Sequence, residues 1–82
     1  MPSEQVEVHL FAAARAAVGA SIVPAIPGSL RSILDRLCDE HPAFATVRPR
    51  CSVLVDGVAV HGEDVEVAPG GRVDVLPPFA GG

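Results

Sequence analysis

Three stretches of alternating or apolar residues predict strands in the first and last parts of the chain. Residues 6–10 alternate apolar and polar side chains, as do the first four residues of the segment 72–76, and this period-two pattern is typical of a strand with one buried face. Residues 21–23 form a short run that we interpret as the hairpin partner of the first strand. Pro24 and Pro27 follow it. Because proline has no backbone N–H to donate, they place the later part of this strand at a sheet edge or end it.

A second hairpin is predicted in the C-terminal half of the chain. Residues 51–55 and 58–60 are rich in valine, and only Asp56-Gly57 separates them. An Asp-Gly pair between β-branched runs is a strong hairpin signal, because both positions of the tight turn need a positive φ. Residues 65–67 follow as a further short extended segment before the turn into the last strand.

One amphipathic helix is expected between the two hairpins. Its apolar residues recur at spacings of three and four, so that they share one face of the helix. These residues are Leu30, Ile33, Leu34, Leu37 and Cys38. Ser29 precedes them as a residue type that caps helices. His41-Pro42 ends the helix, because the residue before proline avoids helical angles.

A minor helix and a loop complete the expected elements. Residues 11–18 are rich in alanine, which has the highest helix propensity, and Gly19 follows as a helix stop. Residues 48–50 lie between the main helix and the second hairpin, and we expect a loop through them. Apart from the minor helix, the predicted order is therefore strand, strand, helix, strand, short strand, strand.

This order predicts an α+β fold, in which one main helix packs across one face of a mixed sheet of four to five strands. The connection through the helix places the C-terminal strand beside the first strand, parallel to it and inside the sheet. Such an arrangement is that of a β-grasp, or ubiquitin-like, fold. No repeat, linker or low-complexity segment divides the sequence, so we expect residues 1–82 to form a single domain.

Composition and charge argue against several classes of function. The chain of 82 residues has a net charge of −4 and no basic patch, which argues against binding of nucleic acid. No apolar run has the length of a membrane span, and no signal peptide is evident at the N-terminus. We therefore expect a cytoplasmic protein with no membrane or nucleic-acid partner.

No bound metal or cofactor is expected. Cys38 and Cys51 are too few for a four-thiolate zinc or iron–sulfur site, and both fit the apolar patterns of their elements. The three histidines, His9, His41 and His61, do not have the spacing of metal ligands. No phosphate-binding loop or pair of carboxylates in a plausible cleft is evident, so the chain lacks the parts of a self-sufficient enzyme.

The end of the chain carries the most informative pattern. Pro77 and Pro78 end strand pairing, since neither has an N–H, and both favour extended backbone. We therefore expect a flexible C-terminal tail from Pro77 to Gly82. Gly81 and Gly82 have no Cβ, so they fit a slot that is too narrow for any side chain and present a free carboxylate there.

A surface for a partner is expected beside this tail. Strand alternation turns Leu54 and Leu76 away from the core, to the open face of the sheet. Phe11 and Phe79 lie nearby at strand ends. We expect these apolar side chains to form a patch that docks a partner, because a contiguous apolar patch is typical of an interaction site.

Four segments together carry a resemblance to a known family. They are residues 11–19 (Phe-Ala-x-x-Arg-x-x-x-Gly), the helix between Ser29 and His41-Pro42, residues 53–57 (Val-x-Val-Asp-Gly) and residues 73–82 (Val-x-Val-x-Pro-Pro-Phe-Ala-Gly-Gly). On these segments the chain resembles the MoaD/ThiS family of sulfur-carrier proteins, and within it the small subunit of molybdopterin synthase. The resemblance covers residues 6–82, and the last segment is its most specific part.

The resemblance implies a carrier cycle centred on Gly82. A ubiquitin-activating-like adenylyltransferase would use ATP to adenylate its carboxylate, and a sulfurtransferase donor would supply sulfur for a thiocarboxylate (1-thioglycine). The large catalytic subunit of molybdopterin synthase would then receive the tail and build the dithiolene of molybdopterin. By this resemblance Gly81 and Gly82 carry the chemistry. The expected partner-binding residues are Phe11, Leu54, Leu76, Pro77, Pro78 and Phe79.

Three other functions are compatible with the same sequence. A sulfur carrier with this tail also fits the biosynthesis of thiamine, cysteine or a secondary metabolite. A ubiquitin-like modifier would instead join the tail to lysines of other proteins, and a plain β-grasp interaction domain would do neither. The sequence does not identify the activating enzyme, the sulfur donor or the stoichiometry with a large subunit.

Overall fold

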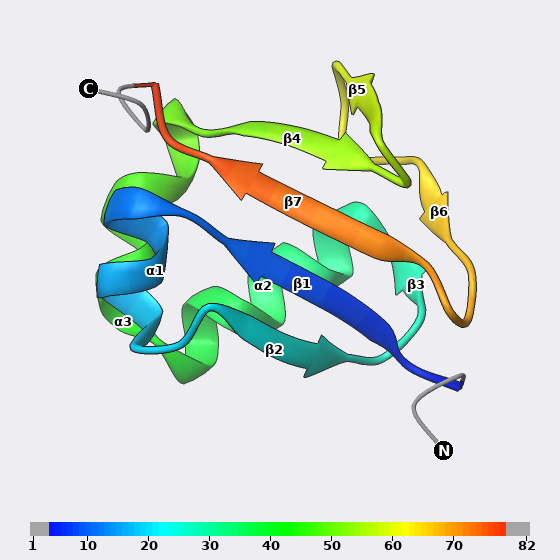
Figure 1. The fold of residues 1–82 in the computed structure, drawn as a ribbon, viewed down its shortest axis with the longest axis horizontal. Coiled ribbons are helices and arrows are strands. Elements are labelled where there is room, and N and C mark those ends of the chain that lie inside the picture. The colour runs from blue at the N-terminus through cyan, green and yellow to red at the C-terminus, as the bar shows by residue number, and fades with distance from the viewer. Residues whose placement is uncertain (1–3, 79–82) are drawn as a thin grey trace.

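The computed structural model of the chain describes residues 4–78, and a five-stranded sheet forms its centre (Figure 1). The strands are β1 (Val6–Leu10), β2 (Ile22–Ala25), β4 (Ser52–Val55), β5 (Val58–Val60) and β7 (Arg72–Leu76). Their order across the sheet is β2-β1-β7-β4-β5, so the first and last strands of the sequence lie in its interior.

The sheet is mixed, and its pairing follows the expected pattern. β1 and β7 are parallel, whereas the other three pairs of neighbouring strands are antiparallel. The turn between β4 and β5 consists of Asp56 and Gly57, which have φ values of 50° and 83° and so form the tight hairpin turn. The predicted α+β class and β-grasp arrangement are confirmed.

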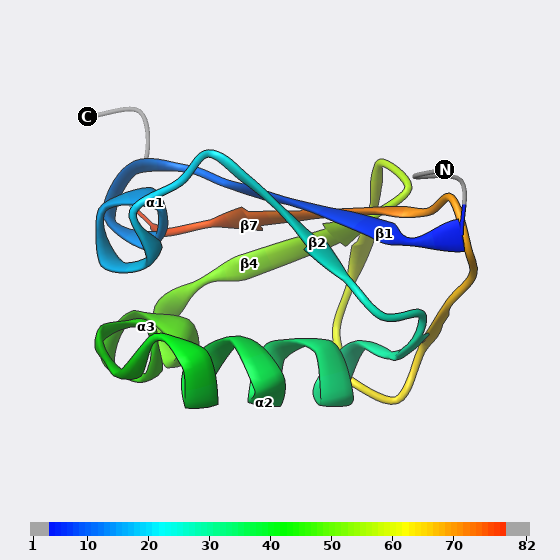
Figure 2. The same ribbon diagram turned by 90° about the horizontal axis from the view of Figure 1, so that it is seen from below.

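The helices gather on one side of the sheet (Figure 2). They are α1 (Ala12–Val18), α2 (Leu30–Glu40), α3 (Pro42–Val47) and the 3₁₀ turn η2 (Arg48–Arg50). The shortest strands, β3 (Gly28–Ser29) and β6 (Glu66–Val67), pair with each other as a separate two-stranded sheet. The opposite side of the five-stranded sheet carries no helix within residues 4–78, and we call it the open face.

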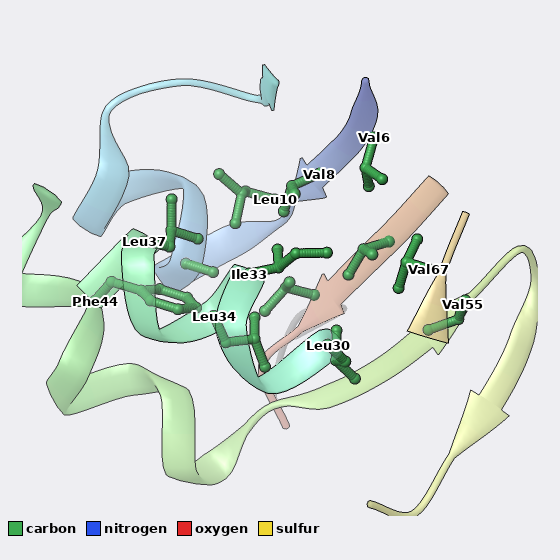
Figure 3. Close-up of a cluster of buried hydrophobic side chains, with 13 residues drawn as sticks. Val6, Val8, Leu10, Leu30, Ile33, Leu34, Leu37, Phe44, Val55 and Val67 are labelled. Carbon is green, nitrogen blue, oxygen red and sulfur yellow. The ribbon is translucent and has the colours of Figure 1, made fainter. Parts of the chain in front are cut away.

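The main helix forms as its sequence predicts. The Ser29 side chain accepts a hydrogen bond from the backbone N–H of Ser32 at 3.1 Å, which satisfies one of the free donors at the start of α2. The apolar stripe of α2 is buried against the sheet at Leu30, Ile33, Leu34 and Leu37 (Figure 3). Burial of these side chains provides most of the driving force for this packing.

The segment after the main helix differs from the prediction. Where we expected a loop, residues 48–50 form the 3₁₀ turn η2, and a short helix, α3, precedes it. Pro42, which ends α2, occupies the first turn of α3, where the N–H that proline lacks would have no helical partner. The ring of Phe44 is completely buried against α2 (Figure 3), so a single aromatic anchor fixes this short helix to the core.

Candidate functional site

The candidate site is the end of β7, from which the chain continues towards Gly82. Leu76, the last residue of β7, is half-buried, Pro77 is buried, and Pro78 is exposed. The predicted tail therefore has its first residue packed against the domain, and its exposed part begins at Pro78 within the described residues. Phe79, Gly81 and Gly82, three of the predicted site residues, lie outside the described residues.

A groove of about 380 Å³ adjoins the two prolines, and we call it the Pro78 groove. Its walls come from segments that are far apart in the sequence, because α1, α3 and η2 all meet the end of β7. The lining residues are Ala12, Ala13, Thr46, Val47, Arg50, Pro77 and Pro78. The groove is thus mostly apolar, with the exposed guanidinium of Arg50 as its charged group.

The start of α1 is held tightly beside this groove. The backbone N–H of Phe11 donates to the carbonyl oxygen of Val75 at 3.3 Å, which joins the end of β1 to the end of β7. Ala12, the next residue, has a φ of 49°, in the left-handed region that residues other than glycine rarely adopt. This backbone conformation turns the chain abruptly from β1 into α1 and places Ala12 and Ala13 in the wall of the groove.

Two predicted partner-binding residues, Leu54 and Leu76, lie on the open face. The register pairs Leu54 with Asp74 and Leu76 with Ser52 across β4 and β7, so the two leucines are diagonal neighbours on one face. Both side chains are half-buried. Phe11 follows β1 one position beyond Leu10, which pairs with Val75, and its side chain is 37% exposed.

A buried carboxylate interrupts this apolar surface. Asp74 is only 8% exposed, although it lies on the outward side of β7 in the alternating pattern. Arg72 donates a hydrogen bond from Nε to Oδ1 of Asp74 at 2.7 Å. In the strand register, His9 of β1 is the residue opposite Asp74. The sequence analysis singled out no role for Asp74, whose register neighbours are His9 of β1 and Leu54 of β4.

Charged residues also fix the position of η2. Arg48 donates to Asp35 of α2 at 2.7 Å and to Glu63 at 2.9 Å, and its guanidinium lies 3.5 Å from the sulfur of Cys38. Burial alone lowers the pKa of Arg48, but the hydrogen bonds to these groups outweigh it and raise the pKa above the usual value. Because η2 is tied to α2 in this way, Arg50 is held at the rim of the Pro78 groove.

Other kinds of site find no support in residues 4–78. The structure there groups no three His, Cys, Asp or Glu side chains that would hold a metal ion, and no helix is long and apolar enough to cross a bilayer. Cys38 and Cys51 are free and half-buried against the core. Burial raises the pKa of the Cys51 thiol, which favours the neutral form of that group.

Comparison with known proteins gives both a family and structural neighbours. The model of the ThiS family matches residues 8–82. SAMP1 from Haloferax volcanii superimposes with a TM-score of 0.81 at 26% identity, covering 95% of this chain and 99% of that chain. No curated protein matches the sequence.

Two further neighbours carry the name of another protein. A putative molybdopterin converting factor, subunit 1, from Pyrococcus furiosus has a TM-score of 0.80 and 24% identity, covering 90% of this chain and 97% of that chain. The third structure is a complex of subunits 1 and 2 of molybdopterin-converting factor from Helicobacter pylori. It has a TM-score of 0.71 and 18% identity, covering 95% of this chain and 99% of that chain. At these identities the two likenesses support the fold.

Proposed function

Because the chain belongs to the ThiS family, we propose that it is a sulfur carrier that holds sulfur as a thiocarboxylate on Gly82. The observation that carries the proposal is the position of the end of β7. The central strand β7 is followed by Pro77 and Pro78, which line an apolar groove next to the open face, and the sequence continues from there to Gly81-Gly82. A partner that docks on these surfaces can therefore receive the residues that follow.

The proposed chemistry needs activation by a partner, because a carboxylate is a poor acyl donor. The Gly82 carboxylate attacks the α-phosphorus of ATP on a ubiquitin-activating-like adenylyltransferase and releases pyrophosphate. The terminal sulfur of a persulfide on a sulfurtransferase then displaces AMP from the acyl-adenylate and forms an acyl disulfide. A second thiol of that partner cleaves the S–S bond, which releases 1-thioglycine at the end of this chain and leaves a disulfide on the partner. This chain contributes the positioned reactant, and the partners contribute the catalytic groups.

The length and composition of the final residues suit such a delivery. Four residues follow Pro78, and an extended segment of this length reaches about 14 Å. Gly81 and Gly82 present only backbone, so a narrow channel in a partner accepts them without steric conflict. An added methyl group at Gly82 would obstruct the same channel.

We further propose that the receiving partner is the large catalytic subunit of molybdopterin synthase, which uses the sulfur for the dithiolene of molybdopterin. Three observations favour this assignment. The converting-factor subunit from Pyrococcus furiosus matches nearly the whole chain, and the Helicobacter pylori neighbour is a complex of subunits 1 and 2. The Pro77-Pro78 pair before the terminal residues also favours the molybdopterin branch over other sulfur carriers.

A ubiquitin-like modifier is the second candidate, and the likeness to SAMP1 supports it. A modifier and a carrier share adenylation at the terminal glycine and differ in the nucleophile that follows. In the carrier, sulfur displaces AMP, whereas in the modifier the acyl group ends on a lysine amine of another protein.

The intact mass of the protein from its native cells distinguishes the two. We expect a fraction of the chain to carry one sulfur in place of one oxygen, with the change located at Gly82 by fragmentation. Recovery of the chain joined through isopeptide bonds to other proteins, with no sulfur-containing form, would instead assign it as a modifier.

Deletion of Gly82 tests the site directly. We expect the shortened chain to lose sulfur transfer with purified partners, while its unfolding midpoint stays unchanged, because Gly82 follows the described domain. Gly62→Ala is a suitable control, since the methyl group it adds would point into open space. Transfer at a near-normal rate after the deletion would refute the role of Gly82.

A further inference from the structure

A second groove lies between β2 and α2, and we call it the β2–α2 groove. Two adjoining hollows of about 450 and 160 Å³ form it, and both are lined by Ala25, Ile26, Ile33, Arg36 and Glu40. It shares no lining residue with the Pro78 groove, and β1 separates β2 from β7 in the sheet. Figure 2 shows β2 crossing over α2 at this edge of the molecule.

The floor of the β2–α2 groove is apolar. Val8, Ile33 and Leu37 contribute buried side chains to it, and all three belong to the core. Ile26 stands at the same groove with 60% of its surface exposed. An exposed large apolar side chain beside an apolar floor offers a partner apolar area to bury.

The rim that α2 contributes is mainly acidic. Asp35, Asp39 and Glu40 line the groove together with one cation, Arg36. Asp35 pairs with Arg48, but within residues 4–78 no ion pair involves Asp39 or Glu40. The excess of carboxylates gives this rim a negative potential, which attracts a cationic partner.

The free edge of β2 is unsuited to continuous strand pairing. The backbone N–H of Leu10 in β1 donates to the carbonyl oxygen of Ser21 at 2.7 Å. Because backbone groups alternate in direction along a strand, those of Val23 also face β1, and those of Ile22 and Pro24 face the free edge. Pro24 has no N–H, so this edge lacks a donor at its centre. Recognition at this groove therefore depends on side chains more than on an added strand.

We propose that the β2–α2 groove binds a segment of another protein in which an apolar side chain is flanked by lysine or arginine. The apolar side chain covers the floor beside Ile26, and the flanking cations pair with Asp39 and Glu40. This interaction goes beyond the sulfur-carrier function, because it uses neither the open face nor Gly82. A second protein can therefore be held while the end of the chain is used elsewhere.

A second copy of this chain is a less suitable occupant. Two such grooves brought together would place the acidic rims of both copies against each other, and the chain as a whole carries a charge of −4. Repulsion between like charges opposes that contact.

Three matched peptides test the proposal on the full chain. Each has the core Ile-Val-Ile, flanked on both sides by Lys-Arg, Ser-Ser or Glu-Glu. In ¹⁵N NMR titrations we expect the affinity order basic, neutral, acidic, with chemical-shift changes centred on Ala25, Ile26, Ile33 and Arg36. Shift changes centred on Leu54 and Leu76, no saturable binding of the basic peptide, or concentration-dependent self-association through the groove would each overturn the proposal.

A pair of charge reversals locates the interaction. We expect Glu40→Arg to weaken binding of the basic peptide about fivefold. Glu66→Arg makes the same change of charge at an exposed residue of β6 and should leave the affinity nearly unchanged. Equal weakening by both variants would show non-specific attraction and refute the groove. Both variants retain Gly82, so sulfur transfer measured in parallel tests the carrier function separately.

Discussion

At the scale of single residues, close backbone approaches limit which side chains the fold accepts. Gly71 precedes β7, where the backbone of residues 67–68 passes close to it. A Cβ at this position would lie 2.9 Å from the carbonyl oxygen of Ala68 and 2.9 Å from a methyl group of Val67. Both atoms belong to the packed domain, so neither moves away without distorting the β6–β7 turn.

We expect Gly71→Ala to lower the free energy of unfolding by about 1–3 kcal/mol, because the added methyl group overpacks this site. Gly62→Ala makes the same chemical change in open space and should alter stability by less than about 0.5 kcal/mol. Urea unfolding of both variants measures the difference. Equal stability of the two variants would contradict the close packing at Gly71.

Single residues also show that an alternating pattern predicts the face on which a side chain lies but not how deeply it is buried. Alternation placed Leu54 and Leu76 on the outer side of the sheet, and the register agrees. It gave no reason to expect Asp74, which lies between His9 of β1 and Leu54 of β4 in the register, to be buried. The hydrogen bond from Arg72 to Asp74 is local, because the two residues lie two positions apart on the same face of β7.

At the scale of elements, α3 is the clearest instance of structure that the sequence did not reveal. Its six residues are too few to establish a helical period. In the sequence, Pro42 was interpreted only as the end of the main helix. Phe44 gives α3 its anchor, and burial of this ring outweighs the low intrinsic stability of so short a helix. The helix in turn forms part of the wall of the Pro78 groove.

Two phenylalanines allow this point to be measured. Phe44→Ala removes a fully buried ring and should lower the free energy of unfolding by about 3–5 kcal/mol. Phe11→Ala makes the same substitution at a partly exposed side chain and should cost less than about 1 kcal/mol. Chemical denaturation followed by circular dichroism compares them. A small cost at Phe44 would mean that α3 contributes little to the core.

At the scale of the whole molecule, the helices cover one face of the sheet and leave the other open. The open face, the Pro78 groove and the exposed end of the described chain adjoin one another at the end of β7. In the proposed function, side chains of the domain bind the partner and Gly82 carries the sulfur. Binding affinity and chemical reactivity therefore depend on different groups of this chain.

We expect Leu54→Ser to weaken binding of the large subunit of molybdopterin synthase about tenfold, because truncation of an apolar side chain at the centre of an interface is costly. Val58→Ser is a matched control, since Val58 is 66% exposed on the edge strand β5. Isothermal titration calorimetry with the purified subunit gives both affinities. Equal affinities for the two variants would exclude the open face as the docking surface.

The sequence by itself determined the order of the main elements, the apolar stripe of α2 and the pairing of β1 with β7. Each depends on local periodicity, on turn residues such as Asp56-Gly57, or on the short list of connections that pack a helix across a sheet. The Gly-Gly sequence at the end of the chain is likewise evident from the sequence alone.

Only the tertiary structure decided the burial of Asp74, the helical form of residues 42–50 and the two grooves. The Pro78 groove joins residues 12–13, 46–50 and 77–78, and the β2–α2 groove joins an edge strand to a helix. Their properties depend on side chains that meet across long sequence separations, and local propensity carries no information about such contacts.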